Sequence, residues 1–267
     1  MLQGGKDDRL RPPTQAVRRG LGTKMLLSVI VPAFNEEKCI AQCLRSIRAA
    51  CEGAAAREDF QHETIVVDNN STDRTAELAR ADGATVIFEP KNQIARARNR
   101  GAEAARGDWF LFVDADSVLS EELLLDMVRV MREGKVVGGG CLCRFPDGAR
   151  KLLRNAMRFW NWISRTFRLA AGSTLFCRAD YFREAGAFNE RVYASEELGL
   201  SQRLKRLGRN YGKEFVILTR YPMLTSARKG DLYTAPAFLR FLLFALASPW
   251  TTFRNPKRCH MWYDGRR

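Results

Sequence analysis

The stretch that decides the fold is residues 109–116, Trp-Phe-Leu-Phe-Val-Asp-Ala-Asp. Its first five residues are continuously apolar, which is typical of a strand that is covered on both faces of a sheet. Two carboxylates, Asp114 and Asp116, follow directly. Because they are two residues apart, extended backbone would place both side chains on the same side. The stretch therefore predicts a buried strand that ends in a pair of acidic side chains.

Short apolar runs alternate with amphipathic runs on the N-terminal side of this stretch. Short strands separated by helices of about ten residues indicate βαβ crossovers, and so a mainly parallel sheet with helices on both sides. The predicted strands are 27–31, 64–67 and 85–88, and the predicted helices are 38–50, 75–81 and 94–105.

After residue 135 the alternation is less regular, but no repeat or low-complexity linker divides the chain. We therefore predict a single α/β domain over residues 25–225. Residues 1–24, rich in Gly, Pro and Arg, predict a flexible tail, and residues 226–267 predict a basic, apolar helical extension. The later strands are expected at 136–143, 173–177 and 215–218, and the later helices at 149–169 and 196–207.

Composition restricts the class of protein. Of 267 residues, 46% are hydrophobic, which is ample for a folded core and argues against disorder. The longest apolar run, residues 241–247, is far shorter than the roughly 20 residues of a membrane-spanning helix. The chain carries 44 Lys and Arg against 30 Asp and Glu, a net charge of +14. This charge fits nucleic acid, an anionic membrane or a phosphorylated substrate equally well.

The cysteines and histidines argue against a zinc site. The seven Cys form no Cys-x-x-Cys pair, and there are only two His. The N-terminus lacks the charged-then-apolar order of a secretory signal, so we expect a cytoplasmic protein with free thiols.

Polar residues follow three of the predicted strands: Pro-Ala-Phe-Asn-Glu-Glu at 32–37, Asp-Asn-Asn-Ser-Thr-Asp at 68–73 and Asp-Ala-Asp-Ser at 114–117. In open α/β sheets, ligands bind outside the carboxyl ends of the strands. Asp114 and Asp116 would suit Mg²⁺ or Mn²⁺, which prefer carboxylate and phosphate oxygens. The alternative is that this pair only caps a helix that begins near Ser120.

Taken in order, these segments resemble the family 2 glycosyltransferases, whose nucleotide-sugar-binding domain has the GT-A fold. The resemblance covers about residues 27–220, and its specificity lies in the ordered set, since each element alone is weak. The elements are VIVPAFNE at 29–36, VVDNNSTDRT at 66–75, ARNRG at 97–101, DAD at 114–116, GAFNE at 186–190 and SEELGLSQRLKRLG at 195–208.

The resemblance implies an enzyme that moves a sugar from a nucleotide-diphosphate-sugar donor to an acceptor hydroxyl. By this resemblance, Pro32, Phe34, Glu36 and Asp68 hold the base and ribose of the donor. Arg98 is similar to the arginine that the family places beside the nucleotide. The alternative for Arg98 is a solvated charge on a basic helix.

The resemblance also implies a metal and a catalytic base. Asp114 would lie near the ribose, and Asp116, with Asp114, would bind Mg²⁺ or Mn²⁺ on the diphosphate. Family members commonly have Glu-Asp where this chain has Glu196-Glu197. We expect Glu197 to take the proton from the acceptor in an inverting reaction, with Glu196 as second choice. The alternative is that both are helix N-terminal acids, which the helix dipole favours.

Two apolar features suggest contacts with the acceptor or with lipid. Phe159, Trp160, Trp162 and Phe167 could stack on sugar rings or lie against lipid, although we favour packing in the core. The segment 232–253 mixes apolar residues with a basic end, as in a helix at a membrane surface or one packed on the domain. The expected acceptor is a carbohydrate or lipid-linked molecule, with peripheral contact at the cytoplasmic face of an anionic membrane.

Two other classes of protein were weighed. An NAD-linked oxidoreductase requires a Gly-x-Gly-x-x-Gly turn after the first strand, which residues 32–35 do not provide, and no phosphate-binding GxxxxGK[ST] loop occurs. A non-catalytic basic protein that binds nucleic acid or an anionic membrane fits the charge and the Arg-rich region 144–168. It leaves the three acidic strand ends unexplained, so we expect no nucleic-acid partner.

Overall fold

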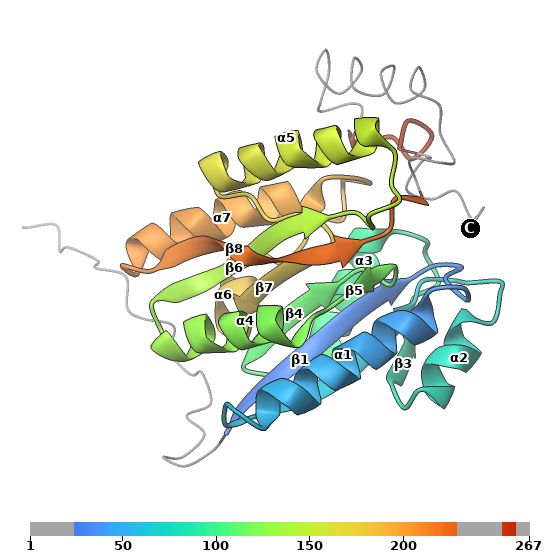
Figure 1. Cartoon of the computed structure of the whole chain (residues 1–267), viewed down its shortest axis with the longest axis horizontal. Coiled ribbons are helices and arrows are strands. Elements are labelled where there is room, and N and C mark those ends of the chain that lie inside the picture. The colour runs from blue at the N-terminus through green and yellow to red at the C-terminus, as the bar shows by residue number, and fades with distance from the viewer. Residues whose placement is uncertain (1–23, 229–252, 260–267) are drawn as a thin grey trace, which may run out of the picture.

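The computed structural model describes residues 24–228 and 253–259 of the chain. They form one eight-stranded sheet in the order β3-β2-β1-β4-β7-β6-β8-β5, with helices on both faces (Figure 1). The predicted tail and the predicted helix at 232–253 fall almost entirely outside these residues. Within them, no helix combines the length and apolarity needed to cross a bilayer.

The N-terminal half builds the parallel part of the sheet. Strand β1 pairs in parallel with β2 and β4, and β2 pairs in parallel with β3, so the predicted βαβ crossovers are confirmed. The elements are β1 (Met25–Ala33), α1 (Ile40–Ala55), β2 (Phe60–Asp68), α2 (Thr75–Ala81), β3 (Thr85–Phe88), α3 (Ile94–Ala104) and β4 (Trp109–Val113).

The C-terminal half makes the sheet mixed. Strand β7 runs antiparallel to both β4 and β6, β5 is antiparallel to β8, and β6 and β8 are parallel. The pattern missed β5 and α6 because neither is long enough to display a hydrophobic period. The elements are β5 (Ser117–Val118), α4 (Glu121–Glu133), β6 (Val136–Arg144), α5 (Lys151–Phe167), β7 (Thr174–Arg178), α6 (Ala179–Glu184), α7 (Glu196–Asn210) and β8 (Glu214–Thr225).

The core lies on both faces of the sheet, as the continuous apolar run 109–113 predicts. All five residues of β4 are buried. Leu111 packs with α1 and α4 on one face, whereas Phe110 and Phe112 pack with α3, α6 and α7 on the other. Burial on both faces fixes the direction of β4, and with it the position of the acidic residues that follow.

Gly101 lets α3 lie close against β1. A Cβ atom at this position would lie 2.4 Å from Cγ2 of Ile30 and 3.0 Å from Cγ2 of Val67. Any side chain here would push the helix away from the sheet. The close approach sets the height at which α3 presents Arg98 to the carboxyl edge.

Candidate active site

The turns that follow β1 and β2 bind each other at the carboxyl edge of the sheet. The backbone N–H of Asn35 donates to Ser71 Oγ (3.0 Å), and Asn35 Oδ1 accepts from the N–H of Thr72 (2.8 Å). The N–H of Glu36 donates to Thr75 Oγ1 (2.7 Å). Asn35 has a φ of 53°, a left-handed conformation that Asn tolerates better than most residues. The predicted meeting of these strand ends is therefore observed.

Asp68 and Asn69 organise the second turn. Asp68 is buried, and its Oδ1 accepts from the N–H of Ser71 (2.9 Å). Asn69 Oδ1 accepts from the N–H of Gln93 (2.8 Å), at the start of α3. Upstream, Pro32 lies in the β1–β2 ladder. The partly buried Phe34 follows at the turn, so the residues predicted to hold the donor lie on two adjacent strand ends.

Arg98 is buried at the centre of the site, so the alternative of a solvated helix charge is wrong. Its side chain is 2% exposed. It donates to Asp114 Oδ1 (2.9 Å), to Glu196 Oε1 (2.5 Å) and to the carbonyl of Gly172 (2.6 Å). Burial alone would lower the pKa of Arg98, but the surrounding carboxylates outweigh it and raise that pKa. Arg98 therefore ties β4, α7 and the loop before β7 together.

The pair Asp114 and Asp116 does not serve as the cap of α4. Ser120 caps this helix, since its side chain accepts from the N–H of Leu123 (3.3 Å). The side chains of Asp114 and Asp116 are 24% and 12% exposed at the end of β4. The alternative prediction of a capping role is therefore wrong, because the neighbouring serine fills it.

The two aspartates fit a site that holds a divalent cation together with a substrate phosphate. Within residues 24–228 and 253–259, no three His, Cys, Asp or Glu side chains gather as a metal-binding group. Mg²⁺ is commonly bound by one or two carboxylates, with the rest of its ligands from phosphate and water. Asp114 Oδ1 accepts from Arg98, so a cation at this site would share Asp114 with the arginine.

Arg228, which follows β8, lies between the β1 turn and the aspartate pair, and the sequence analysis missed it. Its Nη2 is 2.8 Å from Glu36 Oε2 and 3.6 Å from Asp116 Oδ2. Glu36 is nearly fully buried, so this ion pair offsets the cost of its burial. No local pattern could reveal the contact, because 192 residues separate Arg228 from Glu36.

Glu196 and Glu197, the acidic pair at the N-terminus of α7, differ in their surroundings. Ser195 precedes the pair with a φ of 61°, a left-handed conformation that turns the chain into the helix. Glu196 is buried against Arg98. Burial, together with the charge of Glu196, raises the pKa of Glu197 from 4.5 to about 8. Glu196 thus holds the arginine, and burial beside this charge favours the protonated form of Glu197.

Glu197, Arg98 and Gly172 lie together. A Cβ atom at Gly172 would lie 3.5 Å from Arg98 Nη2 and 3.7 Å from Glu197 Oε1. Since Arg98 also binds Asp114, one guanidinium lies between the residues predicted to hold the metal and the residue predicted to take the proton. The two predicted halves of the site are therefore one cluster.

The segments ARNRG and GAFNE bind each other. Asn99 Nδ2 donates to the carbonyl of Phe188 (3.0 Å), and Asn99 Oδ1 accepts from the N–H of Phe188 (3.0 Å). The guanidinium of Arg98 lies 5.3 Å from the centre of the Phe188 ring. This pairing brings the loop before α7 onto α3, and so fixes where the acidic pair stands.

The described C-terminal residues 253–259 also contact this loop. The N–H of Tyr193 donates to the carbonyl of Phe253 (2.6 Å). Cys259 is buried, and its pKa is raised to about 11 by burial and by the charge of Glu196. Residues 253–259 therefore pack beside the loop that leads into α7.

The predicted core packing of the α5 aromatics is wrong for three of the four. Phe159, Trp162 and Phe167 are more than half exposed, and only Trp160 packs partly against the core. Helix α5 meets the sheet along one narrow stripe, with Ser164 as its single buried residue, so side chains outside that stripe remain in solvent.

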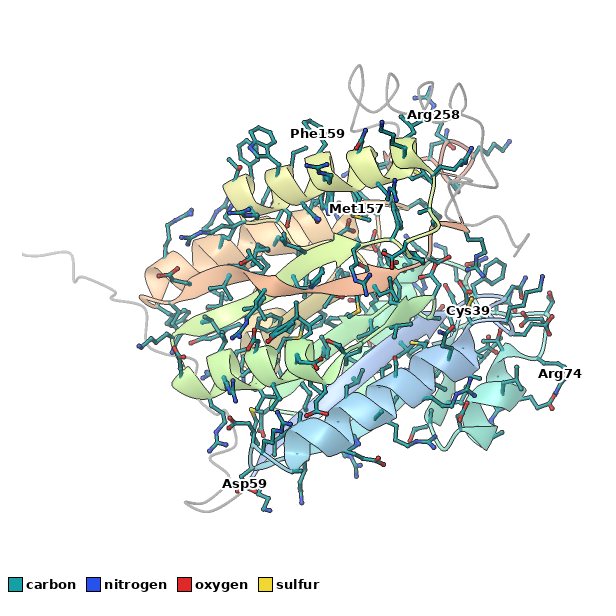
Figure 2. All side chains as sticks on the ribbon, in the orientation of Figure 1. Cys39, Asp59, Arg74, Met157, Phe159 and Arg258 are labelled. Atoms are coloured by element: carbon teal, nitrogen blue, oxygen red, sulfur yellow. The ribbon has the colours of Figure 1, made fainter. Side chains whose placement is uncertain are left out.

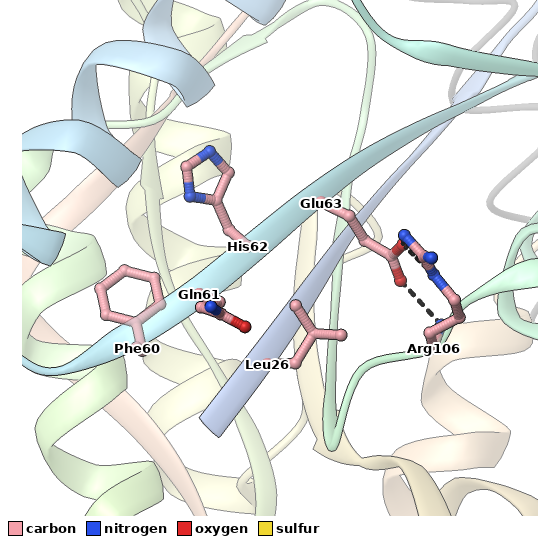
Figure 3. A pocket seen from close by; sticks show the side chains of 6 residues that line it. All are labelled: Leu26, Phe60, Gln61, His62, Glu63 and Arg106. Carbon is pink, nitrogen blue, oxygen red and sulfur yellow. Dashed lines mark hydrogen bonds and ion pairs between the residues drawn. The ribbon is translucent and has the colours of Figure 1, made fainter. Parts of the chain in front are cut away.

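A separate hollow of about 600 Å³ lies at the opposite, amino edge of the sheet. Figure 3 shows its lining around Leu26, His62 and Glu63, with Arg106 paired to Glu63. Burial alone would raise the pKa of Glu63, but hydrogen bonds from Ser28 and Arg106 outweigh it and lower that pKa. The carboxylate of Glu63 is therefore held in an ion pair with Arg106. The candidate site lies at the opposite, carboxyl edge of the sheet.

Comparison with known proteins identifies the family. Residues 28–184, more than half of the chain, match the model of glycosyl transferase family 2. The hexosyltransferase Agl6 of low-salt glycan biosynthesis in Haloferax volcanii is 38% identical over 109 residues, which are 40% of this chain and 25% of that protein. Glycosyltransferase AglE of the same organism is 27% identical over 198 residues, which are 70% of this chain and 63% of that protein. The chain thus spans less than two thirds of the length of either relative.

Solved structures show the same fold. The mannosyltransferase PcManGT of Pyrobaculum calidifontis, solved in complex with GDP-Man and Mn²⁺, superposes with a TM-score of 0.60 at 19% identity. The match covers 82% of this chain and 61% of that one. The family model and both relatives are named for glycosyl transfer, which argues against the alternative of a non-catalytic basic protein. The chain has the GT-A fold and belongs to glycosyl transferase family 2.

Proposed function

We propose that this glycosyltransferase uses a nucleotide-diphosphate-sugar donor and inverts the anomeric carbon, with the donor bound at the carboxyl edge of β1, β2 and β4. The observation that carries the proposal is the buried bridge of Arg98 between Asp114 and Glu196. It holds the candidate metal site beside the candidate base. The mannosyltransferase of the same fold, in complex with GDP-Man and Mn²⁺, supports this class of donor.

The base and ribose of the donor would lie on the joined turns after β1 and β2. Pro32, Phe34, Glu36 and Asp68 stand at this edge. Asp68 holds its turn closed through Ser71, so it offers a preformed surface to the ribose. Arg98 acts as a positioning residue, because its buried guanidinium orients carboxylates on two elements.

Asp116, assisted by Asp114, would hold Mg²⁺ or Mn²⁺ against the diphosphate. Such a cation stabilises the negative charge that develops on the leaving nucleoside diphosphate. Arg228 brings a second positive charge to the same place. Its ion pair with Asp116 would be exchanged when the cation and donor bind.

Glu197 would accept the proton of the acceptor hydroxyl. The hydroxyl oxygen attacks the anomeric carbon from the face opposite the diphosphate, the bond to the diphosphate oxygen breaks, and the configuration inverts. The raised pKa makes the carboxylate of Glu197 a stronger base once it has lost its own proton. The acceptor is a carbohydrate or a lipid-linked molecule, and we place the reaction at the cytoplasmic face of a membrane with which the protein makes peripheral contact.

A thermal-shift screen tests the donor site. Wild type, Asp116→Ala and the exposed control Asp147→Ala are each heated with UDP-, GDP- and dTDP-sugars, with and without Mn²⁺. At about 100-fold excess over Kd, one nucleotide should raise the Tm by about 5 °C in a metal-dependent way in wild type and the control, but not in Asp116→Ala. Equal shifts in all three proteins would contradict the role of Asp116, and no shift with any donor would overturn the proposed donor class.

A further inference from the structure

Helix α5 uses only one side to pack on the protein. Met157 and Trp160 contact the core on that side, and Asn161 binds both backbone groups of Cys143, at 3.1 Å to its N–H and 2.8 Å to its carbonyl. These contacts anchor the helix firmly to β6. Most of its other residues are exposed, and Phe159 stands on the outer side of the helix (Figure 2).

A second apolar face runs along this exposed side. Leu152 and Phe159 are 67% and 62% exposed, and Ala156 continues the same line at helical spacing. Trp162 is 57% exposed, and its ring stacks on Phe159 with centroids 5.9 Å apart. In the described part of the chain, five large apolar side chains are more than half exposed, and four of them lie on α5. Contiguous exposed apolar surface marks an interaction site.

The helix itself carries charges of one sign, and Arg168 at its C-terminal end pairs with Glu214 at the start of β8 (3.1 Å). Residues 150–168 contain no Asp or Glu. Six basic side chains are exposed there: Arg150, Lys151, Arg154, Arg158, Arg165 and Arg168. A helix with aromatic and Leu side chains on one face and Lys and Arg on the other is typical of helices that lie in the interface of a membrane.

We propose that α5 is a docking helix that binds the surface of an anionic phospholipid bilayer. Leu152, Phe159 and Trp162 enter the boundary between headgroups and acyl chains, and the basic side chains contact lipid phosphates. A second copy of the chain would set two cationic faces against each other, which is unfavourable. Nucleic acid would satisfy the basic side chains but leave the apolar face in water.

Docking would place the candidate base close to the bilayer. Asn161 of α5 binds Cys143, whose Sγ lies 3.1 Å from Ser173 Oγ, and the neighbouring Gly172 lies beside Arg98 and Glu197. A lipid-linked acceptor could therefore present its headgroup to Glu197 without leaving the membrane. This consequence rests on the proposed function, whereas the docking itself does not.

Vesicle co-sedimentation of the full chain tests the proposal without donor or metal. Wild type should bind vesicles of phosphatidylcholine with one quarter phosphatidylglycerol at least tenfold more strongly than pure phosphatidylcholine, and added salt should weaken the binding. The double variant Phe159→Ser/Trp162→Ser and the charge variant Arg158→Glu/Arg165→Glu should each lose at least tenfold. Phe88→Ser, which removes an equally exposed apolar side chain far from α5 in the sequence, should bind like wild type.

Binding that is unchanged in both double variants would overturn the proposal and assign the contact to another part of the chain. Sedimentation velocity without lipid provides a second check. A wild-type dimer that becomes monomeric in Phe159→Ser/Trp162→Ser, with no vesicle binding by either protein, would assign the face to a second copy. Because the assay contains no sugar nucleotide, its failure would remove the peripheral membrane contact but leave the proposed donor site and sugar transfer standing.

Discussion

Charged side chains at the carboxyl edge of β1–β4 and on the outer face of α5 differ in their burial and in their pairing. At the carboxyl edge, charged side chains such as Arg98, Glu36 and Glu196 are almost completely buried, and each is bound to a partner of opposite sign. On α5, basic side chains of one sign stand in solvent beside exposed aromatic rings. Buried, paired charges fix the geometry of a site, whereas exposed charge of one sign beside apolar surface indicates an external partner.

Removing the central arginine should have the largest effect. Arg98→Met leaves the buried Glu196 and the partly buried Asp114 without their shared cation, which should lower the free energy of unfolding by about 3–5 kcal/mol. The matched variant Arg100→Met lies on the same helix in an exposed pair with Glu103 and should cost at most about 1 kcal/mol. Urea denaturation measures both. Equal losses in the two variants would mean that burial of the network does not hold the site together.

Replacing the candidate base should affect chemistry rather than folding. Glu197→Gln should lower the transfer rate by about 10³-fold, within the range that a general base contributes, and leave donor binding unchanged. Glu197→Asp should restore part of the rate because it keeps a carboxylate. Initial-rate kinetics together with nucleotide titration separate the two effects. A Gln variant with a near-normal rate would remove Glu197 from the mechanism.

The pH dependence of stability should show the burial of Glu197. Its pKa is raised from 4.5 to about 8 in the folded state, so between these pH values the folded chain retains a proton that the unfolded chain has lost. The stabilising contribution is therefore full below about pH 4.5 and is lost as pH rises through about 8. Relative to Glu197→Gln, wild type should lose stability from pH 5 to pH 8. Urea denaturation at several pH values measures this loss, and parallel curves for the two proteins would contradict it.

The smallest predicted effect concerns Arg228. Arg228→Met removes the cation that is paired with Asp116 and Glu36, so Mn²⁺ without nucleotide should bind about fivefold more tightly, as expected for a partly exposed ion pair. Arg220→Met, an exposed arginine on β8, serves as the control. Electron paramagnetic resonance of free Mn²⁺ gives the affinities. Weaker binding in Arg228→Met than in the control would show that Arg228 does not compete for Asp116.

Local patterns predicted the N-terminal half of the fold well. A strand that is covered on both faces buries all five side chains of residues 109–113, and the observed β4 has these same bounds. The helices predicted at 75–81 and 94–105 are α2 and α3, with one residue of difference at the end of α3. Their periods are long enough to be read, and their ends coincide with the turns that build the site.

Such local patterns could not predict contacts between residues that are far apart in the sequence. The burial of Arg98 depends on partners up to 98 residues away, and Arg228 joins the site from the far end of the sheet. The aromatic residues of α5 were predicted to pack in the core, and this prediction was wrong for most of them. Their helical spacing predicts an apolar face but not what covers it, and the structure turns Phe159 and Trp162 into solvent.

The central claim is that Asp116 holds a divalent cation against the diphosphate of a nucleotide. Enhancement of ³¹P relaxation by bound Mn²⁺ tests this contact directly, with the nucleoside diphosphate selected by the thermal-shift screen. Wild type and Asp147→Ala should accelerate relaxation of the β-phosphorus strongly, and Asp116→Ala should not. Equal enhancement in Asp116→Ala, or nucleotide bound by wild type with no effect of Mn²⁺ on the phosphorus, would contradict the account.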